Sequence, residues 1–390
     1  MPAFNSSRRR YYSFADVTIH GPSATFAVGN NSFGVYTGAR SVTDVRGVSS
    51  TLTEMGLNGI YHQQFDGVEK SVKNVRVNSL AWAEFGLSAG RIISKEGRDM
   101  WTAGITLKRL IAGGGASIHM DEWNFTMVDS SLVTHSIRGN YGFNNPGWNT
   151  GRGWATDLGV TFKRALNDVS SYTPHSKSSG CETCDYQFKW SIALLDIGRI
   201  KFDPEFYVNQ FDETEESDWD ELSDFGASDA AGLDQNINEG LGFPTDAGET
   251  HFRMWLPGAL STQFDYNFGH HIYVNSSLIM GIPWRNASGP QRGSQIAITP
   301  RYELKRLEFA LPFVLHEYKY PSIGAMLRLN SIIIGTDNLG TYLFNQDVYG
   351  ADIYVNVKYT IFKSWKCRTA STKVAKPQKK RRGYVPCPAW

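Results

Sequence analysis

The alternation of apolar and polar residues near the end of the chain restricts its fold more than any other feature. In residues 352–362 (DIYVNVKYTIF), every second side chain is apolar: Ile353, Val355, Val357, Tyr359 and Ile361. Successive side chains of a β-strand point to opposite faces, so this segment has one apolar and one polar face. Similar segments of about 9–12 residues recur along the chain, and about that length lets a tilted strand cross a bilayer.

Lipid offers no hydrogen-bond partners, so a sheet that crosses a membrane must close on itself. The sequence therefore predicts an all-β fold, a transmembrane antiparallel β-barrel of about 14 strands with an apolar exterior. The sequence contains no run of about 18 apolar residues, the length that a membrane-spanning helix would need. The expected strands occupy residues 23–29, 32–40, 75–93, 100–112, 116–128, 132–143, 153–165, 186–202, 251–267, 271–283, 294–303, 307–318, 323–335 and 351–362.

Segments of different composition surround this barrel. The start of the chain has no apolar stretch typical of a signal peptide, so either the protein is cytosolic or the sequence is a mature form after cleavage. We favour the second interpretation, because a lipid-facing barrel must be exported. Residues 48–61 have a more helical than extended pattern and are expected to form a plug. The predicted regions are an N-terminal arm (1–20), a first hairpin around Gly29-Asn30-Asn31 with the plug-like segment (21–74), the barrel (75–362) and a basic periplasmic tail (363–390).

Two charged segments interrupt the strand pattern. Residues 203–250 hold fifteen acidic residues and no Lys or Arg, whereas residues 363–382 hold nine basic residues and no acidic one. One interpretation is that both are solvated and partly disordered. The other is that the acidic insert pairs with the basic tail, or that each binds a charged partner. Counting the expected strands places both segments on the same side of the membrane.

The side chains of the expected strands divide into a lipid-facing and a lumen-facing set. The lipid-facing set of the last strand consists of Ile353, Val355, Val357, Tyr359 and Ile361. Because the lumen-facing charges have both signs, we expect them to pair inside a narrow or plugged barrel. They are Glu84, Lys108, Asp157, Lys163, Asp265, Arg301, Arg328, Asp352 and Lys358, and the tryptophans expected in interfacial girdles are Trp82, Trp101, Trp154, Trp190, Trp255 and Trp284.

No residue pattern predicts catalysis, a metal site or a cofactor. The sequence has no GxSxG, HExxH or Walker motif, and Gly113-Gly114-Gly115 is interpreted as a tight turn between two strands. His270 and His271 are neighbours on a strand pattern and would point to opposite faces, so we interpret them as a turn rather than as metal ligands. A net charge of +1 and the lack of a nucleic-acid-binding module argue against binding of nucleic acid.

The basic tail is predicted to dock a partner in the periplasm, namely peptidoglycan or an acidic protein. The four cysteines do not form two CxxC units, so an exported chain favours disulfides over zinc. By analogy with secreted frameworks, Cys367 and Cys387 would close a loop in the tail, and Cys181 and Cys184 remain as the second pair. The expected docking residues are Lys379, Lys380, Arg381, Arg382 and Trp390.

Several segments, in this order, carry a likeness to a known group of proteins. They include SLAWAEFGLSAGRII (79–93), GRGWATDLGVTFKR (151–164), WSIALLDIGRIKF (190–202), ITPRYELKRLEFALPFVL (298–315) and GADIYVNVKY (350–359). Together they resemble the FadL-like and PorV-like outer-membrane barrels of Bacteroidota, most closely a lineage related to the PorP/SprF group. The resemblance covers most of residues 75–362.

This resemblance implies a barrel in the cell outer membrane, surrounded by membrane lipid and lipopolysaccharide, without enzymatic activity. Some members of the group move hydrophobic molecules, and others are docking subunits of type IX secretion or gliding machinery. We therefore expect a structural or docking subunit that contacts other envelope proteins. The alternatives are a FadL-like transporter of a hydrophobic small molecule and a secreted, soluble glycan-binding β protein.

Overall fold

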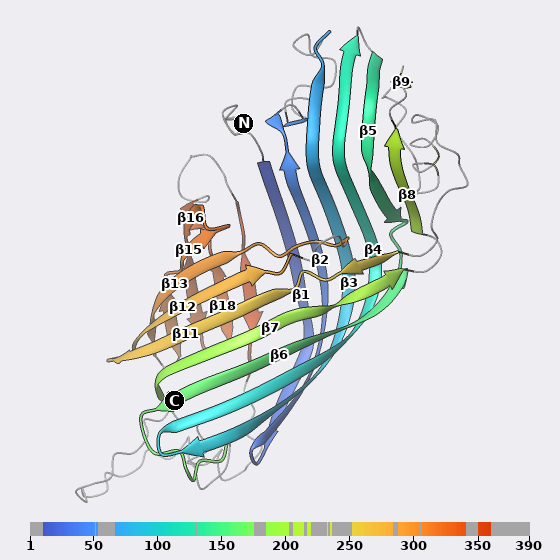
Figure 1. Cartoon of the computed structure of the whole chain (residues 1–390). Coiled ribbons are helices and arrows are strands. Elements are labelled where there is room, and N and C mark those ends of the chain that lie inside the picture. The colour runs from blue at the N-terminus through green and yellow to red at the C-terminus, as the bar shows by residue number, and fades with distance from the viewer. Residues whose placement is uncertain are drawn as a thin grey trace, which may run out of the picture.

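The computed structural model supports an all-β description of the chain (Figure 1). The described strand bounds are β1 (Tyr11–Val28), β2 (Asn31–Val48), β3 (Lys70–Glu96), β4 (Asp99–Val128), β5 (Ser131–Asn144), β6 (Gly151–Ala165), β7 (Tyr186–Phe202), β8 (Phe206–Glu213), β9 (Ser217–Trp219), β10 (Arg253–Trp255), β11 (Ala259–Gly269), β12 (Ile272–Gly281), β13 (Gln295–Glu303), β14 (Leu307–Ala310), β15 (Phe313–His316), β16 (Tyr320–Ile323), β17 (Ala325–Leu329), β18 (Ile332–Thr336) and β19 (Tyr354–Val357). The structure describes residues 11–50, 52–53, 67–128, 131–174, 185–202, 206–213, 217–219, 232, 235, 252–283, 288–304, 306–340 and 350–359.

All these strands belong to one antiparallel, 19-stranded sheet. Its hydrogen-bonded path runs β1–β2–β3–β4–β6–β7–β11–β12–β13, then through β14 and β17 to β18 and β19. The remaining strands join this path at its sides: β5 pairs with β4, β8 and β9 with β5, β10 with β7, and β15 with β13 and β16. Within the described residues no ladder joins β1 to β19, so the sheet is curved but not closed.

The connections between strands differ at the two ends of the sheet. At one end, called the short-turn end, tight turns occur at Gly29-Asn30, Gly97-Arg98, His270-His271 and Asn330-Ser331. Gly29, Gly97, His270, His271 and Asn330 have positive φ, as two-residue hairpins require. The predicted hairpin around Gly29 is therefore confirmed, and His270-His271 form a turn. The opposite end carries the long connections 49–69, 203–252, 282–294 and 337–353, and we call it the long-connection end. Exceptions occur at both ends: β6 and β7 are joined by the long connection 166–185 at the short-turn end, and β15 and β16 by a tight turn over 317–319 at the long-connection end.

The prediction of a tight turn at Gly113-Gly114-Gly115 is wrong, because β4 runs through these glycines without reversing. They lie where the neighbour of β4 changes from β6, paired with residues 99–112, to β5, paired with residues 116–128. A Cβ on Gly115 would lie 2.5 Å from the Phe202 ring, so only glycine fits there. The expected strands 100–112 and 116–128 are thus one strand.

The expected strand 323–335 is two strands, β17 and β18, which reverse at Asn330. This miscount reverses the predicted sidedness of the charged segments. β7 ends with Phe202 at the long-connection end, whereas β19 ends with Val357 beside Ile332 at the short-turn end. The strands that precede the acidic insert and the basic tail, β7 and β19, therefore end at opposite ends of the sheet. Part of the insert is also ordered, since β8 and β9 pair with β5.

Two other predicted regions differ from the structure. Tyr11 to His20, expected in the N-terminal arm, form the first part of β1 because they pair with β2 as far as Val48. Most of the plug-like segment 48–61 lies outside the described residues, as do Ile361, Trp284, the four cysteines and the docking residues 379–390.

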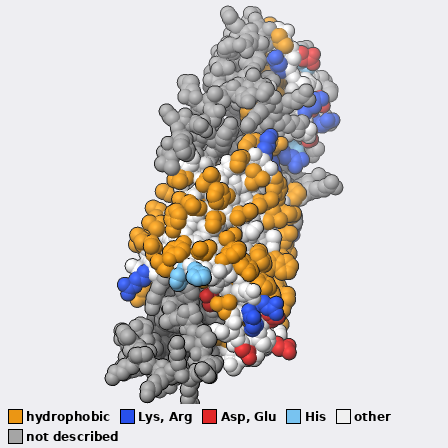
Figure 2. Space-filling model, turned by 90° about the vertical axis from the view of Figure 1, so that its left-hand side faces the viewer, with side chains coloured by type: hydrophobic (Ala, Val, Ile, Leu, Met, Phe, Trp, Pro, Cys, Tyr) orange, Lys and Arg blue, Asp and Glu red, His pale blue; other side chains and the backbone are white. Residues whose placement is uncertain are grey.

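The sheet has two chemically different faces. The inner face carries the buried side chains, and the outer face carries exposed apolar ones such as Leu107, Leu158 and Ile192, which are 47, 44 and 42% exposed. Figure 2 shows hydrophobic side chains in a broad band across one side of the molecule, with Lys, Arg, Asp and Glu toward the two ends of the band. No helix in the described part of the chain has the length and hydropathy of a membrane span.

Candidate functional site

Asp196 is the centre of a buried ion cluster on the inner face. Its carboxylate accepts hydrogen bonds from Lys108 Nζ at 2.6 Å, Arg40 Nη1 at 2.8 Å and Arg292 Nη2 at 2.8 Å. Lys108 Nζ also lies 2.7 Å from Asp157 Oδ2. Asp196 is 1% exposed, so three cations share one carboxylate with almost no access to solvent.

A β-bulge puts Asp196 in this position. The register between β6 and β7 shifts at this point, because Thr156 pairs with Ile197 while Leu158 pairs with Leu194. Asp196 has a φ of 56°, and its N–H donates to Asp157 Oδ1 at 2.7 Å. The extra residue turns the Asp196 side chain to the inner face, which an unbroken alternation would not do.

A second ion cluster lies on the inner face closer to the short-turn end. Arg301 Nη1 donates to Asp265 Oδ2 at 2.9 Å, and Arg301 Nη2 donates to Tyr186 Oη at 2.9 Å. Arg328 Nε donates to Glu308 Oε2 at 2.7 Å. The acceptors and donors come from β7, β11, β13, β14 and β17, so the cluster connects strands that are distant in sequence.

The connection between β12 and β13 folds over the inner face, and its described part is residues 288–294. Gly289 N–H donates to Asn78 Oδ1 at 3.3 Å, Gln291 N–H donates to Asp44 Oδ1 at 3.1 Å, and Arg292 joins the Asp196 cluster. Figure 1 shows this connection reaching from β12 and β13 toward β3. An apolar cluster that includes Leu80, Phe202 and Met254 is buried on the same face. The inner face is therefore filled along this part of the sheet.

The residues predicted to face the lumen have several environments. Lys108 and Asp157 meet in the Asp196 cluster, and Asp265, Arg301 and Arg328 meet in the second one. Glu84 is buried and accepts a hydrogen bond from Trp82 Nε1 at 3.1 Å. The others are more separate: Lys163 Nζ lies 5.5 Å from the centre of the Tyr186 ring, Asp352 accepts from Asp337 N–H at 2.8 Å, and Lys358 is exposed.

Sequence patterns did not identify Asp196, Arg40 or Arg292 as parts of a site. Arg40 lay in an expected strand without being assigned to a face, and Arg292 lay in an expected loop. The one available signal for Asp196 was the interrupted alternation of residues 190–198, which the bulge explains. Of the tryptophans expected in girdles, Trp82 is 2% exposed and packs under Arg40 on the inner face, so that assignment is wrong.

Two cross-strand rows of side chains mark the outer face. The first, the Arg–Trp row, consists of Arg109, Trp154, Arg199 and Trp255, directly opposite one another on β4, β6, β7 and β10. Arg109 lies 5.0 Å from the Trp154 ring and Arg199 lies 5.7 Å from the Trp255 ring, both as cation–π contacts. The second, the aromatic row, consists of Trp101, Phe162, Trp190 and Phe264 on β4, β6, β7 and β11.

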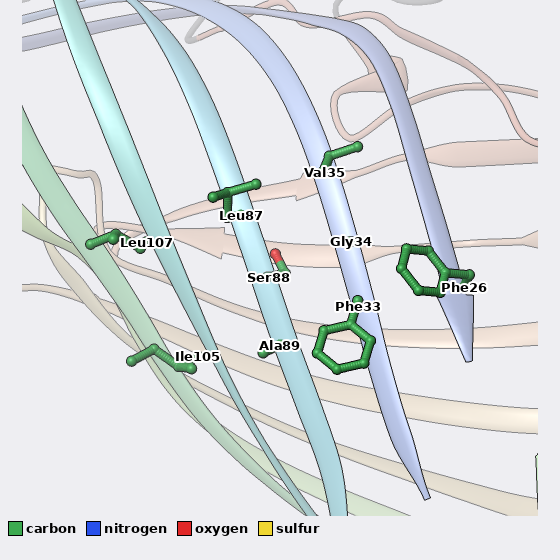
Figure 3. Close-up of a pocket in the computed structure, with 9 residues that line it drawn as sticks. All are labelled: Phe26, Phe33, Gly34, Val35, Leu87, Ser88, Ala89, Ile105 and Leu107. Atoms are coloured by element: carbon green, nitrogen blue, oxygen red, sulfur yellow. The ribbon is translucent and has the colours of Figure 1, made fainter. Parts of the chain in front are cut away.

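Apolar side chains fill the outer face between these rows. On β6, Leu158 and Val160 lie between Trp154 and Phe162. The stretch 154–162 contains nine residues, close to the about 9–11 residues of a membrane-crossing strand. On β1 to β4 the apolar surface has a hollow of about 440 Å³ (Figure 3). It forms because the short Ala89 side chain stands between Phe33 and Ile105 in the register of β2, β3 and β4.

The lipid-facing set predicted near the end of the chain is exposed where it is described. Ile353, Val355, Val357 and Tyr359 are 73, 63, 71 and 79% exposed. Tyr354 and Asn356, on the other face of β19, are exposed as well. Because β19 is at the edge of the described sheet, exposure there does not distinguish the two faces.

The long β3, β4 and β5 extend beyond the Arg–Trp row at the long-connection end, and Figure 1 shows them projecting from the rest of the sheet. This projection carries ordinary surface ion pairs. Glu122 Oε1 lies 2.6 Å from Lys73 Nζ, and Glu122 Oε2 lies 3.6 Å from Arg138 Nη2. Hydrogen bonds from Lys73 and then Asn124 lower the pKa of the Glu122 carboxyl below its usual value.

The fold and these two faces define a class: all-β proteins with one large antiparallel sheet, ionic on its inner face and apolar on its outer face. The chain itself belongs to the DUF5723 family, described as a family of unknown function, which matches residues 2–337. No curated protein matches the chain, and no solved structure does.

Proposed function

We propose that the protein is a non-enzymatic β-barrel of the cell outer membrane, and that it serves as a structural or docking subunit of an envelope complex. The observation that carries this proposal is the division of the sheet into an outer face of exposed apolar side chains and an inner face of buried ion pairs. Water favours the reverse arrangement, with polar side chains outside, whereas lipid favours the one observed. Aromatic and Arg side chains at the margins fit the membrane–water interfaces.

A docking role is favoured over a diffusion pore by the filled inner face. The clusters around Asp196 and Arg301 pair opposite charges, whereas an ion-selective pore carries mainly one sign. Residues 288–294 add a loop across the same face. The second candidate function is a FadL-like transporter of a hydrophobic small molecule, which the apolar hollow beside Ala89 favours. A secreted glycan-binding protein is disfavoured by the exposed Leu107, Leu158 and Ile192.

In outer-membrane barrels short turns lie in the periplasm and longer loops lie outside the cell. Applied to this sheet, the rule places the acidic insert 203–250 at the cell surface and the start of the basic tail in the periplasm. We expect a protease added to intact cells to cleave within residues 203–250 and to leave residues 363–390 untouched. Cells with a permeabilised outer membrane provide the control, since both segments are then accessible. Cleavage of the tail alone on intact cells would contradict this orientation.

Purification in mild detergent from the native membrane tests the docking role. We expect other envelope proteins to co-purify with the full chain, and we expect their recovery to fall at least fivefold when residues 363–390 are deleted. The deleted variant should retain a folded barrel, since these residues follow the last described strand. A chain that purifies alone with a hydrophobic small molecule bound would favour the transporter.

A further inference from the structure

The outer face carries a third row of side chains, beyond the Arg–Trp row, and all of them are cations. Arg152 on β6 pairs with Lys201 on β7, and Lys201 pairs with Arg253 on β10. We call these three residues the basic ladder. Their neighbours along each strand, Gly153, Ile200 and Met254, are buried on the inner face, so the three cations point outward, and all three are exposed.

Within the described residues, no carboxylate forms an ion pair with the basic ladder. Arg152 Nε donates to the neutral Asn149 Oδ1 at 2.9 Å, and within the described residues neither Lys201 nor Arg253 has an ion pair. Like charges directly opposite each other in a sheet destabilise it. Three such cations in one row, with Arg109 and Arg199 in the next row, have no counter-charge among the described residues and so favour an anionic ligand.

The position of the ladder restricts the chemistry of that ligand. On one side of it lies the Arg–Trp row, followed by the apolar surface of Leu158, Ile192 and Leu194. A ligand that covers both regions has acyl chains next to phosphate groups, because guanidinium groups bind phosphate through paired hydrogen bonds. The ladder also lies at the long-connection end, which under the proposed orientation is the cell-surface leaflet, where lipopolysaccharide replaces phospholipid.

We propose that the basic ladder binds the phosphates of the lipid A part of lipopolysaccharide, while its acyl chains cover the adjacent apolar face. This inference rests on the proposed outer-membrane location and adds to it a specific lipid and a specific side of the barrel. Arg109 and Arg199, held over Trp154 and Trp255, supply further cations at the depth where the sugar–phosphate headgroup meets the acyl chains.

The test compares two variants that each remove three exposed cations from the full chain. One carries Arg152→Gln, Lys201→Gln and Arg253→Gln. The matched control carries Arg91→Gln, Arg306→Gln and Lys358→Gln, which lie toward the short-turn end. Binding of purified diphosphoryl lipid A to the detergent-solubilised protein is measured by native mass spectrometry. We expect at least a tenfold weaker binding for the ladder variant and less than a twofold change for the control.

Monophosphoryl lipid A and a phosphate-free diacylglycerol separate the contributions of phosphate and acyl chain. We expect the wild type to bind them in the order diphosphoryl, monophosphoryl, diacylglycerol, with the difference between the first two reduced in the ladder variant. Equal binding of lipid A by the ladder variant and the wild type would overturn the inference, as would equal losses in both variants. Failure of the proposed function is seen separately, as a wild-type protein absent from the outer membrane.

Discussion

Asp196→Asn is expected to destabilise the protein by about 3–5 kcal/mol, the cost of leaving buried charges without their partner. Lys108, Arg40 and Arg292 all donate to the Asp196 carboxylate, and both Asp196 and Arg40 are nearly inaccessible. An amide in the same place removes the negative charge and directs an N–H₂ group at the cations. The measurement is urea-induced unfolding in detergent micelles, followed by tryptophan fluorescence.

Asparagine is the appropriate replacement because of the backbone at this position. Asp196 has a φ of 56°, and Asn adopts the left-handed region more readily than most other residues. The loss of stability is therefore assigned to the charge rather than to strain. Glu122→Gln serves as the control, since Glu122 pairs with Lys73 at a partly exposed site of the projection, and we expect little change.

A double variant tests whether the cluster acts as a unit. Lys108→Met alone removes one cation from Asp196 and Asp157, and together with Asp196→Asn it removes one charge of each sign. Residues in one ion-pair network are not additive, so we expect the double variant to be less destabilised than the sum of the two single ones. Strict additivity would show that Asp196 and Lys108 contribute independently to stability, and it would contradict the view that the cluster acts as a unit.

Local alternation predicts much of this fold, because the period of two is a property of the strand itself. The strand over residues 186–202 is confirmed with both of its ends, and the hairpin at Gly29 is confirmed although its strands are longer than predicted. One error occurs where glycine has two structural roles. Gly113-Gly114-Gly115 are typical of a turn, but here they let β4 bend and exchange neighbours while its strand continues.

The ion clusters were harder to predict, because they depend on which strands become neighbours. Lys108 and Asp157 were assigned to one face from their own strands, but their common partner Asp196 comes from a bulge, and Arg292 comes from a loop. Neither feature has a periodic signal. The basic ladder was also hard to predict. No sequence pattern connects Arg152, Lys201 and Arg253, and only the register of β6, β7 and β10 places them side by side.

Leu158→Arg is expected to prevent or strongly impair assembly of the protein in the membrane. Leu158 lies on β6 between Trp154 and Phe162, is 44% exposed, and has Ile105 and Leu194 as its cross-strand neighbours. A cation on the lipid face of a barrel costs about 2–4 kcal/mol at the membrane midplane and about 0–1 near the interfaces. The measurement is the fraction of folded protein in vesicles of outer-membrane lipid, detected by its altered mobility in unheated gel samples.

Leu166→Arg is the matched control, because it makes the same chemical change at an equally exposed leucine. Leu166 follows the end of β6 at the short-turn end, outside the apolar stretch, and is also 44% exposed. In lipid only Leu158→Arg should lower the folded fraction, since its guanidinium has no water within reach. In water both leucines would be solvated and both changes tolerated, so equal folding of the two variants would contradict a lipid-facing exterior.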